Sequence, residues 1–223
     1  MHWVIMMIFT SNITDLNDRA TTPVRRFVCT LDSLLRRAYR IQEFSRSEDC
    51  ILRLALGRSK EDVILPDGTR ITKGEPIGEL HLWNEHIPPM PAKGPDFGWG
   101  LMFYRRLIRS LRELAVYVEH EPKFKAVRAF RGEIAFDPQA HRRPALFARL
   151  GFDFMRPAHP SPLRRFGDFW ENLYAWSLIW TFNPGSLRSK RFWRLERCQL
   201  WISRQALLER YGDRGVRGGM GCV

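Results

Sequence analysis

The sequence has few of the residues and motifs that identify common enzyme classes. Its four cysteines, Cys29, Cys50, Cys198 and Cys222, lie too far apart for paired zinc ligands and do not form a dense disulfide framework. No Ser/His/Asp arrangement, nucleophile elbow or CxxC pair is present. These absences argue against the common hydrolase and redox classes, and the sparse cysteines favour a reducing compartment.

Long hydrophobic runs are also missing. No window reaches about 18 apolar residues without a charge, the length that a membrane-spanning helix needs. The apolar run near the start is short even for a signal-peptide core, and no Lys or Arg precedes it. We therefore expect residues 1–26 to be a disordered leader. We expect the protein to be cytoplasmic, with peripheral attachment to the inner membrane as an option.

Basic residues are abundant, and the formal net charge is +12 over 223 residues. Such a charge favours contact with nucleic acid, anionic lipid or phosphate without selecting among them. In the last third, aromatic residues interleave with Arg and Lys, which suits an anionic membrane surface, a glycolipid or unpaired bases. A structural role in core and rim is the other interpretation. Because many of these aromatics fall in one apolar segment, 166–182, we rank the membrane above nucleic acid.

Hydrophobic periodicity predicts one α+β domain at 27–158, a basic aromatic-rich extension at 159–212 and a disordered tail at 213–223. Asp67 and Gly68 supply the residues of a tight hairpin turn. We expect a mixed, mostly antiparallel sheet flanked by helices, with an aromatic-rich helical extension at the C-terminal end. The expected helices are 28–45, 101–118, 144–150, 166–182 and 204–212, and the expected strands are 50–56, the two arms of a hairpin at 62–74, 77–83, 127–136, 152–156 and 198–202.

Glu79 and His81 are the candidate catalytic residues. They lie two positions apart on an expected strand and therefore on the same face of the sheet. A carboxylate beside an imidazole can orient it as a general base or supply two metal ligands. The alternative is a hydrogen-bonded histidine at a strand end and a solvated glutamate. His86 is a further candidate, but no third ligand is evident, so we predict no metal site.

The loop before the long helix is the candidate cofactor site. Lys93, Gly94, Gly98 and Gly100 stand where small residues and free backbone N–H groups can hold an anion at a helix N-terminus. The segment lacks both the P-loop pattern and the dinucleotide fingerprint, so a simple Pro/Gly-rich connector is the alternative. Residues at the start of this loop and in the first turns of the helix complete the candidate site, namely Asn84, His86, Tyr104 and Arg105.

The residues Asp67-Gly68-Thr69, Gly74, His81-Leu82-x-Asn84 and Leu150-Gly151-Phe152 resemble the YkoP-like domain of bacteria. The resemblance covers roughly residues 28–158. That domain occurs alone and attached to polysaccharide deacetylases, and it has no settled biochemical activity. The resemblance therefore implies an association with cell-envelope glycan or glycolipid metabolism.

The order of elements is also similar to that of the GNAT N-acetyltransferase core, whose loop before the long helix grips the pyrophosphate of acetyl-CoA. This resemblance implies acyl-CoA as the cofactor, backbone N–H donors at Gly98 and Gly100, and Glu79 or His81 as the base. Two departures count against activity. Pro95 replaces the usual Arg or Gln of the loop, and Phe147 stands where a tyrosine often protonates the leaving thiolate.

Three functions follow in order of preference. The first is an accessory or binding module in bacterial cell-envelope glycan or glycolipid metabolism, and the second is an acyl-CoA-dependent GNAT-like N-acyltransferase. The third is a nucleic-acid-binding protein.

Overall fold

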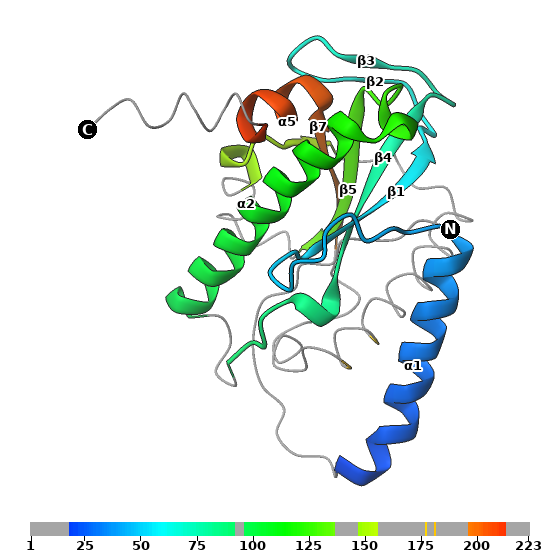
Figure 1. Ribbon diagram of the computed structural model, residues 1–223, viewed down its shortest axis with the longest axis vertical. Coiled ribbons are helices and arrows are strands. Elements are labelled where there is room, and N and C mark those ends of the chain that lie inside the picture. Colours follow the sequence, from blue (N-terminus) through cyan, green and yellow to red (C-terminus); the bar gives the residue numbers. More distant parts are fainter. Residues whose placement is uncertain are drawn as a thin grey trace.

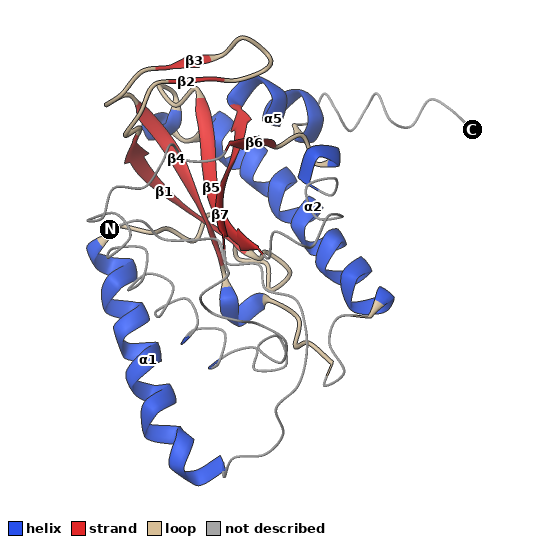
Figure 2. Ribbon diagram, turned by 180° about the vertical axis from the view of Figure 1, so that it is seen from behind, coloured by secondary structure: helices blue, strands red, loops and turns tan. Residues whose placement is uncertain are grey.

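The structure is a computed structural model that describes residues 18–91, 96–136, 147–155, 177, 181 and 196–212. Its centre is a five-stranded sheet in the order β1-β4-β5-β7-β6. Two helices, α2 and α5, lie on one face of this sheet, and the hairpin β2-β3 lies at one end of it (Figures 1 and 2). The sheet strands are β1 (Leu52–Arg58), β4 (Pro76–Leu82), β5 (Ala129–Phe136), β6 (Asp153–Met155) and β7 (Glu196–Ser203).

The remaining elements are helices and one short hairpin. Helix α1 lies to the side of the sheet, away from α2 (Figure 1). The helices are α1 (Asp18–Ala38), α2 (Phe97–His120) and α5 (Arg204–Tyr211), with short 3-10 turns η1 (Asn84–His86) and η2 (Pro122–Phe124), and the hairpin strands are β2 (Val63–Ile64) and β3 (Arg70–Ile71). Within the described ranges, none of the helices is long and apolar enough to cross a membrane.

The sheet is mixed because one pair of its strands is parallel. Strand β4 leads through α2 into β5, and these two strands pair in parallel, whereas β1 with β4, β5 with β7 and β6 with β7 are antiparallel. A parallel pair needs such a crossover, since its chain must return to the same end of the sheet. The predicted α+β class with a mixed, mostly antiparallel sheet is confirmed.

Helix α2 fixes the main hydrophobic core. The Asp96 carboxylate accepts a hydrogen bond from the Trp99 amide and caps the first turn, which satisfies one of the free N–H groups there. The apolar face of α2 then packs on the sheet through residues such as Phe103, Leu107 and Leu111. The helix begins four residues before the expected 101 and ends at His120, two residues after the expected 118.

The predicted Asp67-Gly68 hairpin is present, although Gly68 and not Asp67 takes up a left-handed conformation. Gly68 has φ +84°, a left-handed value that costs glycine little. Side chains of the hairpin bury Ile77, Ala129 and Trp201, which belong to the sheet face turned away from α2. The hairpin forms its own two-stranded sheet and does not enter the large one. The expected run of three antiparallel strands is therefore absent from the described strands, and the GNAT-like order that included it is not confirmed.

The first and last helices of the described chain differ in how well they match their expected bounds. The first helix begins at Asp18, inside the expected leader, and ends before residue 45. Helix α5 lies within the expected range 204–212, and Ser203 caps it by accepting a hydrogen bond from the Ala206 amide. The aromatic segment 166–182, apart from Ser177 and Thr181, and the tail 213–223 lie outside the described residues.

Candidate functional site

Polar side chains gather on the sheet face that is turned away from α2. Because successive residues of a strand point to opposite faces, the core residues of each strand alternate with members of this second set. Most of its members are buried, with exposed fractions of 3–7% for all except Glu79, which is intermediate. We call this set the polar sheet face, and its residues are Arg53, Glu79, His81, Arg131, Glu133 and Gln199.

Glu79 is held by an ion pair across two strands. It lies opposite Arg131 in the parallel register of β4 and β5, and the Arg131 guanidinium donates to its carboxylate at 2.9 Å. Glu133 lies 4.0 Å from the same guanidinium. A Cβ on Gly57 would come within 2.5 Å of the Glu79 carboxyl carbon, so glycine leaves the space that this carboxylate occupies. Glu79 therefore neutralises a buried arginine.

His81 lies on the same face, as predicted, and is buried and neutral. It is directly opposite Arg53 in the antiparallel register of β1 and β4. Burial, and then the charges of Arg131 and Arg53, lower the pKa of His81 from 6.5 to about 3. Its Nε2 atom has no hydrogen-bond partner among the described residues. The expected His–Glu pairing is not among the described contacts, because Glu79 instead meets Arg131.

Arg53 is surrounded by acceptors and an aromatic ring. Its guanidinium lies 3.2 Å from Glu43, 3.4 Å from Glu85 and 4.4 Å from the centre of the Trp83 ring. Trp83 in turn stacks on His86, with ring centres 3.7 Å apart. This arrangement joins the polar sheet face to the start of the loop after β4.

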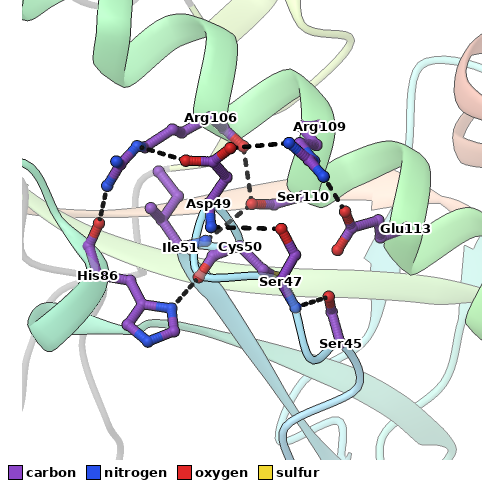
Figure 3. Close-up of polar contacts among 10 residues, drawn as sticks. All are labelled: Ser45, Ser47, Asp49, Cys50, Ile51, His86, Arg106, Arg109, Ser110 and Glu113. Carbon is purple, nitrogen blue, oxygen red and sulfur yellow. Dashed lines mark hydrogen bonds and ion pairs between the residues drawn. The ribbon is translucent and has the colours of Figure 1, made fainter.

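A second polar cluster lies where β1 begins, beside the first half of α2 (Figure 3). The Asp49 carboxylate accepts from Arg106 at 3.2 Å and from Arg109 at 2.7 Å. Arg106 also donates to the His86 carbonyl at 2.7 Å, and the His86 Nδ1 atom lies 2.9 Å from the Cys50 carbonyl oxygen. Both the carbonyl oxygen and the Nδ1 atom of His86 therefore take part in contacts that hold the loop in place.

Beside this cluster is an open groove with a volume of about 430 Å³. It contains two residues that the sequence singled out, Gly98 and Arg105. Among described residues, Arg105 is the one arginine of the groove that has no carboxylate partner. We call this feature the arginine groove, and its lining residues are Asp49, Gly98, Leu101, Met102, Arg105, Arg106 and Arg109.

Apolar side chains border the arginine groove. Leu101 and Met102 line it and are 37% and 42% exposed, and Phe97, one turn earlier on α2, is 86% exposed. Asp49, Arg106 and Arg109 were not among the residues predicted from the sequence. The two arginines could have been found from the sequence, because the spacing of Arg105, Arg106 and Arg109 places basic groups along one side of a helix.

The interior between β4 and α2 is closed by side chains. The cavity there has a volume of about 20 Å³ and an apolar lining that includes Leu80, Phe103 and Leu107. Phe147 also lines it and contacts the Phe152 and Phe154 rings edge-on. Such a volume is close to that of a single water molecule, so the structure gives no room for a cofactor between this strand and the helix.

The other sequence-predicted residues do not converge on one site. The Gly100 amide, expected to bind a phosphate, donates instead to the Asp96 carbonyl at 3.0 Å. Asn84 begins η1, and Tyr104 packs partly buried against the core. Lys93 and Gly94 lie outside the described residues. No group of three or more potential metal ligands occurs in the described ranges.

Comparisons with known proteins give a family and one relative. A family model described as the YkoP domain matches residues 23–211. The uncharacterized protein YkoP of Bacillus subtilis (strain 168) is 24% identical over 123 residues, which cover 54% of this chain and 63% of that relative. The chain therefore spans less than two thirds of the relative's length. No solved structure matches the chain. The residues that the family model matches include the polar sheet face and the arginine groove.

Proposed function

Since the chain belongs to the YkoP domain family, we propose that it is an accessory binding module of bacterial cell-envelope glycan or glycolipid metabolism. It acts at an anionic membrane surface and has no catalytic role of its own. The observation that carries this proposal is the arginine groove, because three arginines there lie beside exposed apolar side chains.

The composition of the groove favours an amphiphilic anion over a compact soluble one. Guanidinium groups bind phosphate or carboxylate through charge-assisted hydrogen bonds. Leu101 and Met102 line the same groove, and Phe97 exposes 86% of its surface on the preceding turn. Exposed apolar side chains next to basic ones are typical of surfaces that lie at the boundary between headgroups and acyl chains. An anionic glycolipid in a membrane supplies both partners, because its headgroup carries the charge and its acyl chains offer the apolar surface.

The acyltransferase alternative receives less support. Its candidate base Glu79 is paired with Arg131, and His81 is neutral and 7% exposed. Both residues lie on the sheet face turned away from α2, whereas Gly98 and Gly100 belong to α2. A direct transfer between an amine at Glu79 and a thioester at this helix would need an opening through the packed β4–α2 interior.

Co-sedimentation with lipid vesicles tests the proposal. At low salt, the full chain should bind vesicles that contain anionic phospholipid and should not bind vesicles of neutral phosphatidylcholine. Binding should fall as the salt concentration rises, because ions screen charges that are more than about 8–10 Å apart near physiological ionic strength. Equal binding to both vesicles, or binding to neither, contradicts the proposal.

Thermal unfolding with acetyl-CoA tests the acyltransferase alternative. A ligand at a hundred times its dissociation constant stabilises a protein by about 2.7 kcal/mol, which raises the unfolding temperature measurably. We expect no such rise with saturating acetyl-CoA or longer acyl-CoA esters. A clear rise in the unfolding temperature would favour the acyltransferase function over the binding module. A parallel titration with single-stranded DNA tests the nucleic-acid alternative, for which affinity should fall steeply with salt.

A further inference from the structure

The contacts of Asp49 restrict what the arginine groove can bind. Arg106 and Arg109 already share the Asp49 carboxylate, with N–O distances of 3.2 and 2.7 Å. Arg109 has a second carboxylate partner in Glu113, at 3.1 Å. Only Arg105 among the groove arginines lacks a carboxylate partner within the described part of the chain. An incoming anion therefore meets one free guanidinium and two that are already occupied.

Electrostatics then separates ligands by their charge. The guanidinium groups of Arg105, Arg106 and Arg109 attract every anion that enters the groove, and the Asp49 carboxylate repels it. Because three positive charges face one negative charge and the Coulomb energy is proportional to the ligand charge, a doubly charged group gains about twice as much as a singly charged one. A phosphate monoester carries between −1.5 and −2 at neutral pH and offers three acceptor oxygens in the geometry that arginine forks match.

From these contacts we propose that the arginine groove selects lipids with a terminal phosphate monoester or diphosphate over lipids with a singly charged phosphodiester, and that Asp49 limits this selectivity by offsetting part of the arginine charge. The phosphate oxygens bind Arg105, Arg106 and Arg109, while Leu101 and Met102 contact the lipid chain. This inference rests on the proposed function, since it specifies the headgroup that the membrane surface must offer.

The experiment compares two sets of phosphatidylcholine vesicles at pH 7.5. One set contains phosphatidic acid, a phosphate monoester, and the other contains phosphatidylglycerol, a phosphodiester, with the amounts adjusted to equal zeta potential. The wild-type chain should bind the phosphatidic acid vesicles about fivefold more tightly. This factor corresponds to about 1 kcal/mol, the largest contribution usual for an exposed ion pair. Equal binding to the two vesicles overturns the inference.

The variant Asp49→Asn tests the role assigned to Asp49. It should strengthen binding to both kinds of vesicle and widen the ratio between them, because a more positive groove favours the doubly charged headgroup more than the singly charged one. Its matched control is Glu119→Gln, which makes the same change in net charge at an exposed position near the far end of α2. That control should keep the wild-type ratio. If Glu119→Gln changes the ratio as much as Asp49→Asn, net charge and not Asp49 determines the selectivity.

Two further results separate this inference from the proposed function and from a soluble ligand. Failure to bind either anionic vesicle removes the proposed function, whereas binding without preference removes only the selectivity. Glycerol 3-phosphate at millimolar concentration should not displace the protein from phosphatidic acid vesicles, because it lacks the chain that Leu101 and Met102 contact. Efficient displacement would assign the groove to a soluble phosphate.

Discussion

At the scale of single residues, His81 couples the fold to pH. Burial and two nearby arginines lower its pKa to about 3 in the folded chain, against 6.5 for the free side chain. Below pH 6.5 the unfolded chain takes up a proton that the folded chain does not. The stability that neutral His81 contributes is therefore present in full above pH 6.5 and is lost as the pH falls from 6.5 towards 3.

The variant His81→Gln makes this coupling measurable. Urea unfolding of both proteins between pH 7.5 and 4.5 gives the free energy of unfolding, and subtraction removes the effect of other groups. The wild type should lose up to about 1.4 kcal/mol per pH unit more than the variant in the acid part of this range. Parallel pH dependences of the two proteins would mean that His81 has the same pKa in the folded and unfolded chains, which contradicts its burial as a neutral group.

The ion pair of Glu79 and Arg131 should stabilise the fold by balancing a buried charge. Replacing Glu79 with Gln leaves Arg131, 5% exposed, with only the more distant Glu133. Because an uncompensated buried charge is costly, we expect the free energy of unfolding to fall by about 2 kcal/mol, measured by urea unfolding. The control is Arg128→Gln, which removes an exposed pair with Glu75 at 3.8 Å. That change should cost no more than about 1 kcal/mol. Similar losses in both variants would contradict the assignment.

The sequence predicts some of these residue relations and misses others for a physical reason. The two-residue period of a strand places Glu79 and His81 on one face, and this prediction is confirmed. Their partners come from elsewhere in the chain. Arg131 becomes the neighbour of Glu79 only through the pairing of β4 with β5. Asp49 meets Arg109 only because β1 begins beside α2. Contacts between distant segments leave no local pattern.

At the scale of elements, the N-terminus of α2 depends on Asp96. Its carboxylate accepts the Trp99 amide at 2.7 Å. Replacing Asp96 with Ala should lower the free energy of unfolding by about 1 kcal/mol, the usual cost of losing such a cap. Chemical denaturation followed by circular dichroism measures this loss. Asp96→Ser retains a side-chain acceptor and should recover most of it. Equal losses for Ala and Ser would show that the cap is not the source.

Helices and turns with a strong local sequence pattern were predicted well. The pairing between strands was predicted less well. The regular apolar spacing of α2 and the Asp67-Gly68 turn each specify one local structure, and both are present. The strand order and the separate hairpin sheet depend on which apolar surfaces meet. Ile77 and Trp201, for instance, bury one hairpin face. The sequence alone did not exclude a hairpin that joins the main sheet.

At the scale of the whole molecule, the structure shows where part of the net charge of +12 lies. Much of the basic charge of α2 lies along the arginine groove, next to exposed Leu101 and Met102. The basic charge and the aromatic segment 166–182 together predict an anionic membrane surface or glycolipid as partner. That segment lies mostly outside the described residues, so its role stays a prediction. The groove on α2 is the surface on which the proposed membrane attachment now rests.

The most direct test of this account compares two double variants of equal net charge on anionic vesicles. Arg105→Ala with Arg109→Ala removes two guanidinium groups from the groove, whereas Arg112→Ala with Arg128→Ala removes two exposed ones outside it. Co-sedimentation at fixed salt should show at least about a tenfold loss of affinity for the groove variant, since each bound guanidinium contributes about 1 kcal/mol near a charged bilayer. The control variant should bind nearly as the wild type does. Equal losses in the two variants would contradict a specific groove and leave a general effect of charge.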